Sequence, residues 1–225
     1  MHIGLIGGIG PAATELYYRG LVARHAAAKR PMELTIVHAD VHDLARNAGE
    51  GAAQRQAEIF LGYVRRLQAA GAEAAAITSI GGHFCVRELE AFSPLPILNA
   101  IPAVVDWIRA SGHKTIGLLG TRTVMQSRLY GGITSASVVV PAGAALDAVH
   151  DNYVAMALSS RVTDAQRSAL FAAGASLVRD QGADLVMLAG TDLFLAFDGR
   201  DCGFPVVDAS DIHMDALTRA SIGAG

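Results

Sequence analysis

The sequence predicts an α/β protein of two pseudo-symmetric lobes, each a mostly parallel sheet flanked by helices. Two observations lead to this fold class. Short segments that are almost entirely apolar alternate with longer stretches of helical pattern, and their order is repeated in the second half of the chain. Strands that are apolar throughout are buried on both faces, which is typical of parallel sheets covered by helices. Their alternation with helices indicates the α/β class.

The expected elements can be assigned in chain order from these patterns. Short apolar runs predict strands at residues 2–8, 33–40, 72–79, 115–121 and 183–190. The segments between and after them predict helices at residues 12–28, 51–70, 101–111, 144–158, 164–181 and 209–221. Thr163 and Asp164 are residue types that often precede the first turn of a helix, so both are candidate N-cap residues for the helix at 164–181.

The repeat consists of three matched segments in the same order. IGLIG begins at Ile3 and its counterpart IGLLG at Ile116, while GAEAAAI begins at Gly71 and its counterpart GADLVML at Gly182. The separations within the two halves are 68 and 66 residues. A third pair, LPILNA and FPVVDA, follows at similar spacing. Three ordered matches of this kind indicate two homologous lobes.

We predict a first lobe at residues 1–99 plus 208–225 and a second lobe at residues 100–207. The last helix is expected to pack back on the first lobe. In open parallel sheets, ligands bind beyond the carboxyl ends of the strands. Two facing lobes would therefore form a cleft lined by the loops after Ile6, Ile77, Leu119 and Leu188.

Composition and charge exclude several classes of protein. A hydrophobic fraction of 52% with 17% charged residues argues against disorder, and a net charge of −3 without a long basic run argues against nucleic acid as a partner. No apolar run is long enough for a transmembrane helix, and the first residues lack the features of a signal peptide. The two cysteines form no C-x-x-C pair, so neither a disulfide framework nor a zinc site is expected. We expect a soluble, cytoplasmic protein.

The glycine-rich segment GGIGPAAT joins the first strand to the first helix. Gly8 and Gly10 allow positive φ and close approach of the backbone, and Pro11 suits the first helical turn. Amides at a helix N-terminus favour an anionic group such as a carboxylate. Gly8, Gly10 and Ala13 also match part of a dinucleotide fingerprint, with Asp40 as the ribose acid, but the lobe repeat argues against it. A tight turn without a ligand is an equal alternative to anion binding.

Two further polar segments have competing interpretations. Thr121 and Thr123 lie in the equivalent loop of the second lobe and could either bind a ligand or cap the following helix. His38, Asp40 and His42 would share one face if the segment were extended. These are metal-ligand types, but the sequence offers no fourth ligand, so we favour a solvated loop and expect no metal.

The residues above resemble the aspartate/glutamate racemase family over essentially the whole chain. GLIGGIGPAATELYYRGL is similar to the G-G-M-G-P-x-A-T signature of aspartate racemases, and LLGTRTVMQSRLY to a second-lobe segment, A/G-T-x-x-T-x-x-S-x-x-Y, with Val124 at the second threonine. The resemblance implies a cofactor-independent isomerase acting on a small carboxylate or amino acid, and a homodimer would fit it. In this family two cysteines, one per lobe, flank the substrate α-carbon and exchange its proton.

The first cysteine motif of the family, C-N-T-x-H, is replaced here by SIGGH. Alignment on His83 puts Ser79 at the cysteine position, and the asparagine and threonine are also lost. Backbone amides of Gly81 and Gly82 could hold a carboxylate in their place. Cys85 lies six residues beyond Ser79 and does not fill the position in register.

The second cysteine motif, G-C-T-E-L, is replaced by AGTDL. Alignment on Thr191 puts Gly190 at the cysteine position and Asp192 at the glutamate. Cys202 is displaced further still. Because glycine has no side chain and a serine hydroxyl is a poor base without an activating neighbour, we do not expect racemisation by two thiols.

The remaining candidates for proton transfer are His83 in the first lobe and Asp192 in the second, with Ser79 as a donor. In the alternative interpretation, His83 caps a helix or bonds a backbone carbonyl, and Asp192 caps the next helix. Cys85 is either a small apolar residue or a thiolate nucleophile assisted by His83. Substrate binding is expected from the loops named above and from Thr191.

Three functions therefore stay open from the sequence. The first is an isomerase-type enzyme acting on a small carboxylate, and the second is a small-acid-binding protein that keeps the cleft without the chemistry. The third is a relative of the family's decarboxylases, which need one proton donor, ordinarily a cysteine. Arg46 and Arg122 could each bind a distal carboxylate or be an exposed charge.

Overall fold

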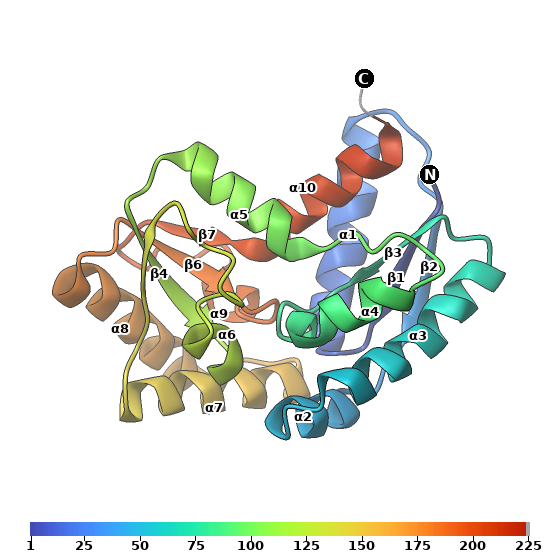
Figure 1. Cartoon of the computed structure of the whole chain (residues 1–225). Helices are drawn as coiled ribbons and strands as arrows, with labels where there is room; N and C mark the ends of the chain where they lie inside the picture. The colour runs from blue at the N-terminus through green and yellow to red at the C-terminus, as the bar shows by residue number, and fades with distance from the viewer. Residues whose placement is uncertain (224–225) are drawn as a thin grey trace. The chain divides into compact units, whose positions relative to one another are not determined.

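The computed structural model describes residues 1–223, which fold into two compact α/β units (Figure 1). Unit 1 comprises Met1–Ala100 together with the segment from Asp211 onward, and unit 2 comprises Ile101–Ser210. These junctions lie one and three residues beyond those of the predicted lobes. Each unit contains a parallel sheet flanked by helices, which confirms the predicted fold class.

Unit 1 is built on a three-stranded parallel sheet in the order β2-β1-β3. Its strands are β1 (Ile3–Gly7), β2 (Leu34–His38) and β3 (Ala74–Ile77). Its helices are α1 (Pro11–Ala27), α2 (Val41–Gly49), α3 (Ala53–Ala69), the 3₁₀ helix η1 (Gly81–Cys85), α4 (Val86–Phe92) and most of α10 (Ala209–Ile222). The helix expected at 209–221 thus matches α10 closely.

Helices cover both faces of the unit 1 sheet. Leu5 on β1 packs in one buried cluster with Tyr17 of α1 and Leu217 of α10. The next residue, Ile6, points to the opposite face and packs in a second cluster with Phe60 of α3. Successive residues of a strand face opposite sides, so burial on both faces explains why the strand is apolar throughout. The packing of α10 on the first lobe is as the sequence predicts.

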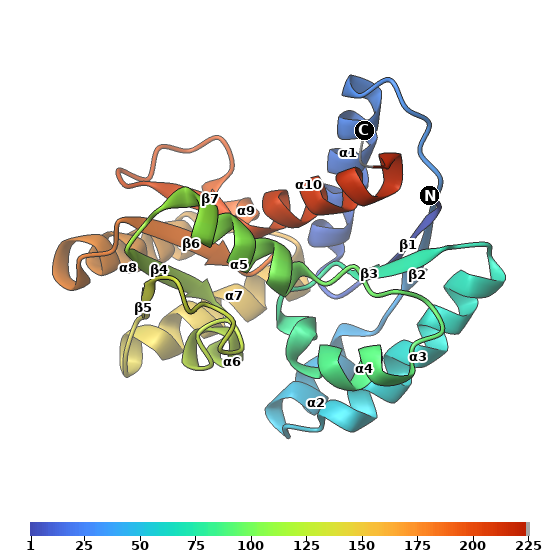
Figure 2. The ribbon, with the colours of Figure 1, turned by 45° about the horizontal axis from the view of Figure 1, so that its top comes forward.

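Unit 2 is built on a four-stranded parallel sheet in the order β5-β4-β6-β7. Its strands are β4 (Thr115–Gly120), β5 (Ser137–Val139), β6 (Leu185–Ala189) and β7 (Val206–Asp208). Its helices are α5 (Ala100–Ser111), α6 (Arg122–Gln126), α7 (Ala144–Ser159), α8 (Asp164–Gln181) and the short α9 (Phe194–Phe197). Figure 2 shows α5 on the other side of these strands from α7.

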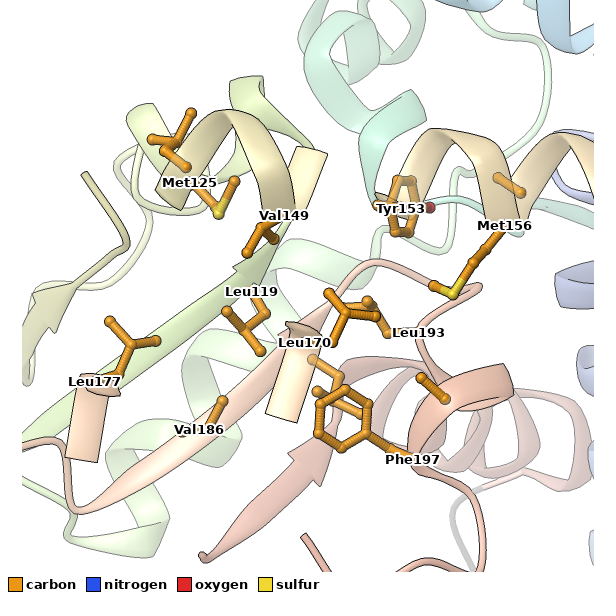
Figure 3. Packing of buried hydrophobic residues seen from close by; sticks show 14 of the residues in the cluster. Leu119, Met125, Val149, Tyr153, Met156, Leu170, Leu177, Val186, Leu193 and Phe197 are labelled. Atoms are coloured by element: carbon orange, nitrogen blue, oxygen red, sulfur yellow. The ribbon is translucent and has the colours of Figure 1, made fainter. Parts of the chain in front are cut away.

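The main buried cluster of unit 2 joins one face of its sheet to α7 and α8 (Figure 3). Leu119 on β4 and Val186 on β6 contribute from the sheet. Val149 contributes from α7, and Leu170 and Leu177 contribute from α8. Thr163 is the N-cap of α8 and forms a capping box with Gln166. Of the two candidate N-cap residues, Thr163 and Asp164, the first is therefore confirmed.

The sequence repeat is visible as the same hydrogen bonds in both units. In unit 1, the Ala75 N–H on β3 donates to the Pro96 carbonyl at 2.9 Å. In unit 2, the Val186 N–H on β6 donates to the Pro205 carbonyl, also at 2.9 Å. Both prolines belong to the third matched segment, LPILNA or FPVVDA. The repeat therefore describes two copies of one arrangement of strands.

Equivalent glycines in the two units also have equivalent packing. A Cβ at Gly4 of β1 would lie 2.8 Å from a methyl carbon of Leu67 on α3. A Cβ at Gly117 of β4 would lie 3.0 Å from a methyl carbon of Leu177 on α8. In each unit the glycine allows a helix leucine to pack directly against the first strand of the lobe.

The structure corrects the interpretation of the segment that contains His38, Asp40 and His42. Strand β2 ends at His38, and α2 begins at Val41 with Asp40 as its N-cap; the Asp40 carboxylate accepts the His42 N–H at 2.7 Å. The chain changes from extended to helical between Asp40 and Val41, so the three residues do not lie in one extended segment. A capping role for Asp40 explains its residue type without a metal or a ribose.

Several short elements lie outside the residue ranges predicted from the sequence. These are α2, η1, α4, α6, α9 and the three-residue strands β5 and β7. For α6, the sequence indicated only that a helix could follow Thr121 and Thr123. Elements of three to nine residues contain too few repeats of a helical or strand period to be recognised. Within residues 1–223, no helix is both long enough and apolar enough to cross a membrane.

Candidate functional site

The loops that follow β1 and β3 in unit 1 are joined by two threonines. Thr14 on α1 accepts the Gly8 N–H through its Oγ1 at 2.8 Å, and this oxygen lies 3.5 Å from Oγ1 of Thr78. The Thr78 hydroxyl donates to the Ile6 carbonyl at 3.2 Å. The two loops are thereby held together, and the Gly8 amide already has an acceptor.

Gly8 and Gly10 have the backbone conformations that the sequence predicts for them. Their φ angles are +88° and +80°, a region that side chains rarely adopt. A Cβ at Gly8 would lie 2.4 Å from Nδ1 of His38 and 2.6 Å from the Ala39 carbonyl oxygen. Gly8 is required both by its conformation and by the closeness of the next loop.

A cavity of about 280 Å³ lies beside Gly8, in unit 1. It is lined by Gly8, Pro11, Thr14, Glu15, Tyr18, Ile36 and His38. The first turn of α1, with Pro11 at its start, forms part of its wall. This cavity adjoins one of the loops that the sequence predicts to bind a ligand.

Ser79 and Gly82 form a tight turn after β3. The Gly82 N–H donates to both the Ser79 carbonyl, at 3.1 Å, and the Ser79 Oγ, at 3.2 Å. Ser79 is buried, and η1 begins two residues after it, at Gly81. The Ser79 hydroxyl thus stabilises the turn as an acceptor and keeps its own hydrogen for another partner.

His83 is bonded to the backbone at both ring nitrogens. Nε2 accepts the Ala100 N–H at 3.2 Å, so Nδ1 carries the hydrogen and donates it to the Ser79 carbonyl at 2.7 Å. Burial lowers the pKa of His83 to about 4. The ring is therefore neutral near pH 7, and the geometry agrees with the alternative in which His83 bonds a backbone carbonyl.

A second buried histidine, His213 on α10, lies beside His83 with ring centroids 6.1 Å apart. Its Nε2 donates to the Leu98 carbonyl at 2.9 Å, and its Nδ1 accepts from the Tyr17 hydroxyl at 2.9 Å. Burial, and then the nearby His83, lower its pKa to about 3. The pair connects the turn after β3, the start of α5 and α10 through neutral hydrogen bonds.

The two cysteines lie in different units, Cys85 buried and Cys202 partly buried. Cys85 is fully buried in the unit 1 core, and its thiol is 3.5 Å from the Gly82 carbonyl, to which it donates. Burial, and then the charge of Glu88, raise the pKa of this thiol to about 12. Cys202 packs at the edge of the unit 2 core with its thiol 3.3 Å from the Phe204 carbonyl. Cys85 has the environment of a small apolar residue.

In unit 2, the loop after β4 is a helix start. Thr121 is the N-cap of α6 and accepts the Val124 N–H at 3.3 Å, while Thr123 lies half-buried in the first turn. Helix capping, one of the two interpretations given for Thr121 from the sequence, thus explains this residue. Arg122 forms an ion pair with Asp147 on α7.

Both arginines considered as partners for a distal carboxylate have acidic partners of their own. Arg122 pairs as described, and Arg46 pairs with Asp43 one turn earlier on α2. All these side chains are well exposed to solvent. These contacts favour the interpretation as surface charges.

The loop after β6 contains three predicted site residues in a row. Gly190, Thr191 and Asp192 follow the last residue of the strand, and Thr191 and Asp192 are fully buried. The Tyr153 hydroxyl, from α7, donates to Oδ2 of Asp192 at 3.3 Å. Burial, and then the nearby Asp192, raise the pKa of Tyr153 well above its usual value, so the phenol stays protonated.

Tyr153 also occupies the space next to Gly190. A Cβ at Gly190 would lie only 2.5 Å from a ring carbon of Tyr153.

Neither Tyr153 nor His213 was identified from the sequence. Tyr153 falls in an apolar helix pattern, where an aromatic residue reads as core, and its contact with Asp192 spans 39 positions. For His213, the only local signal is a lone histidine in a helix with apolar neighbours.

The fold and these loops define a class of protein with two homologous parallel-sheet units whose strand ends carry polar residues. A sequence model of the Asp/Glu/hydantoin racemase family matches residues 6–217. The chain belongs to this family.

Solved structures of similar fold cover nearly the whole chain. A putative Asp/Glu racemase from Yersinia pestis is 26% identical, with a TM-score of 0.82 over 99% of this chain and 100% of that one. An aspartate racemase homologue from Pyrococcus horikoshii OT3 is 24% identical, with a TM-score of 0.78 over 99% of both chains. Glutamate racemase from Francisella tularensis, in complex with D-glutamate, is 14% identical, with a TM-score of 0.65 over 98% of this chain and 81% of that one.

Proposed function

We propose that the chain binds a small carboxylate or amino acid in a cleft between its two lobes, and that it does not racemise this ligand through two thiols. The observation that carries the proposal is that β3 and β6 are followed by Ser79 and Gly190 where the resemblance expects cysteines. Family membership supports the class of ligand, and the related glutamate racemase from Francisella tularensis holds D-glutamate.

The loops after β1, β3, β4 and β6 supply the proposed ligand contacts. In unit 1 these are the backbones of Gly10 and Gly81; the N–H groups of Gly8 and Gly82, also expected from the sequence, instead donate to Thr14 and Ser79. In unit 2 they are the hydroxyls of Thr121, Thr123 and Thr191. Of the residues expected from the sequence to bind the ligand, Gly8 lines the cavity described above. Thr121 accepts a hydrogen bond from the helix and retains a hydroxyl hydrogen that a carboxylate can accept.

The surroundings of Cys85 support the absence of thiol chemistry. A reactive cysteine needs a thiolate near neutral pH, and this thiol is buried with a pKa raised to about 12. His83 cannot assist it as a base, because both ring nitrogens are bonded to the backbone. The cofactor independence and the homodimer implied by the resemblance, and the cytoplasmic location expected from the composition, stay predictions.

Calorimetry and hydrogen exchange test the proposed function together. The probes are L- and D-aspartate and L- and D-glutamate, titrated into the whole protein and then incubated with it in D₂O. We expect saturable binding of at least one probe without entry of deuterium at Cα, as followed by NMR. Thr191→Val should weaken that binding at least about tenfold, the loss of one charge-assisted hydrogen bond.

Cys85→Ala is the matched control for these measurements. Because Cys85 lies in the core and not among the proposed ligand contacts, this variant should bind the probe with unchanged affinity. A chain that binds none of the four probes contradicts the proposed function. Loss of binding in Cys85→Ala would instead favour the nucleophile interpretation.

A second candidate is an isomerase-type enzyme in which Asp192 moves the proton, with Ser79 as the donor on the opposite side. The hydrogen bond from Tyr153 to Asp192 favours this candidate, because a phenol that donates to a carboxylate stabilises its charged, basic form. Deuterium entry at Cα that is lost in Asp192→Asn would support this enzyme over the binding protein.

A further inference from the structure

Gly190 is a glycine for reasons of space. Its φ lies outside the left-handed region, so the backbone conformation does not require glycine at this position. A Cβ here would nevertheless lie 2.5, 3.1 and 3.2 Å from three ring carbons of Tyr153. A contact below 3.0 Å cannot be accommodated unless one of the two groups moves.

The Tyr153 ring is held on two sides and has little freedom to move. It belongs to the buried cluster of unit 2, together with Met156 from the same helix and Leu193 from the loop after β6 (Figure 3). Its side chain is 5% exposed, and its hydroxyl is fixed by the hydrogen bond to Asp192. Rotating the ring away from Gly190 would break this bond and disturb the core.

Another glycine of the chain provides a contrast. A Cβ at Gly20 of α1 would lie 2.4 Å from the sulfur of Met214. That sulfur belongs to an unbranched side chain, which adapts its shape to a new neighbour more readily than an aromatic ring does. The equally short contact at Gly190 involves a rigid aromatic ring and is harder to relieve.

We infer that Tyr153 is the residue that determines the chemistry available at the end of β6, because its ring fills the volume that a side chain at position 190 would need. Position 190 can then hold a thiol only if residue 153 becomes smaller at the same time. The two positions act as one coupled unit, and the polar group that unit 2 offers in place of a thiol is the phenol–carboxylate pair of Tyr153 and Asp192.

The chemical consequence concerns proton transfer at a ligand α-carbon, and this part rests on the proposed function. In a two-thiol reaction, one thiolate forms an S–H bond as the Cα–H bond breaks, and the electron pair stays on the α-carbon. The opposite thiol then gives its proton to that carbon and becomes the thiolate. Cysteines at 79 and 190 can supply this pair only when Tyr153 is shortened.

The packing part is tested by thermal unfolding of the whole chain. Gly190→Ala in the presence of Tyr153 should lower the melting temperature by about 3–9 °C, and the same change in a Tyr153→Leu background should lower it by less than half as much. Tyr153→Phe keeps the ring and should behave like Tyr153 towards Gly190→Ala. Tyr153→Ala repeats the test with a smaller side chain, and Gly20→Ala is the control with a flexible neighbour.

The chemical part compares two thiol-restored proteins in D₂O with L-aspartate and L-glutamate. The double variant Ser79→Cys/Gly190→Cys, which keeps Tyr153, should show no deuterium entry at Cα of either amino acid. The triple variant that also carries Tyr153→Leu should show deuterium entry. Equal destabilisation by Gly190→Ala in all backgrounds overturns the inference, as does exchange by the double variant that keeps Tyr153. If the packing coupling is present but neither protein exchanges, the proposed ligand site is contradicted and the coupling stands.

Discussion

His83 illustrates how a residue of catalytic type acquires a structural role from its surroundings. Its two ring nitrogens bond the Ser79 carbonyl and the Ala100 amide, which come from the turn after β3 and the start of α5. Burial keeps the ring neutral, because a charged imidazolium would lose its hydration without gaining a counter-charge. At the residue scale, the histidine joins two backbone segments that a sequence pattern treats as separate.

Gly8 gives a prediction at the same scale. Gly8→Ala should lower the free energy of unfolding by about 1–3 kcal/mol, because a φ of +88° strains any side chain and the new Cβ would meet His38 and Ala39. Chemical denaturation measures this change. Gly62→Ala on α3, where no atom lies within 4 Å of a new Cβ, is the control and should be neutral or slightly stabilising. An unchanged midpoint for Gly8→Ala would contradict the packing described for this loop.

At the scale of elements, the same solution to packing occurs in both units. A glycine on the first strand of each lobe lets a leucine from a long helix approach, as Gly4 does for Leu67 and Gly117 for Leu177. A third strand then pairs with a proline-led segment in each unit. The long helices α3 and α8 are therefore positioned by the strands and not by their own amphipathic pattern alone.

The N-terminus of α8 provides a prediction for an element. Thr163 accepts the Gln166 N–H through its hydroxyl at 3.2 Å, and the Gln166 side chain accepts the Thr163 N–H at 2.8 Å. Thr163→Ala removes the first of these bonds and should cost about 1 kcal/mol of unfolding free energy. Thr163→Ser keeps a hydroxyl and is the matched control. Equal stability of the alanine and serine variants in denaturant titrations would show that the cap contributes nothing.

At the scale of the whole molecule, His83 and His213 link stability to pH. Both pKa values are lowered in the folded chain, to about 4 and about 3, from an unfolded value near 6.5. Between the folded and unfolded pKa values, the unfolded chain binds more protons than the folded chain, so the free energy of unfolding falls as the pH falls below 6.5. The stability that comes from burying the two neutral rings is fully present above pH 6.5.

Melting temperatures from pH 8 to pH 4 measure this dependence. Below pH 6.5, the free energy of unfolding should decrease with falling pH by up to about 1.4 kcal/mol per pH unit for each buried histidine. His83→Gln should lower stability at pH 7.5 and reduce the slope at acid pH. His42→Gln is the control, because His42 is exposed, and it should leave the slope unchanged. A wild-type profile that is flat between pH 6.5 and pH 5 would contradict the burial of neutral histidines.

Much of the fold was predictable because both faces of each sheet are covered. Ile3–Gly7 and Leu185–Ala189 are buried at every position, and such strands appear in the sequence as continuous apolar runs. The helix at 209–221 was predicted almost to its ends. The segment from His38 to His42 was not, because a nine-residue helix gives little periodicity and its N-cap aspartate also resembles a ligand.

For Ser79 and Gly190, the sequence predicted the place after a strand but not the contacts. The parallel sheets place Ser79 and Gly190 after β3 and β6, as the pattern of strands indicates. The partners of these residues come from elsewhere: Ala100 meets His83, and Tyr153 fills the space beside Gly190. Nothing local in the sequence marks Tyr153, since an aromatic residue on a helix is ordinary core.

By itself, the sequence determined the α/β class, the twofold repetition of the lobe and the family, because these depend on patterns of burial and spacing that are written along the chain. Only the tertiary structure decided that His83 is locked between backbone groups, that the Cys85 thiol is held neutral, and that Tyr153 closes position 190. These properties arise from desolvation and steric contact between residues distant in sequence. No local pattern encodes them.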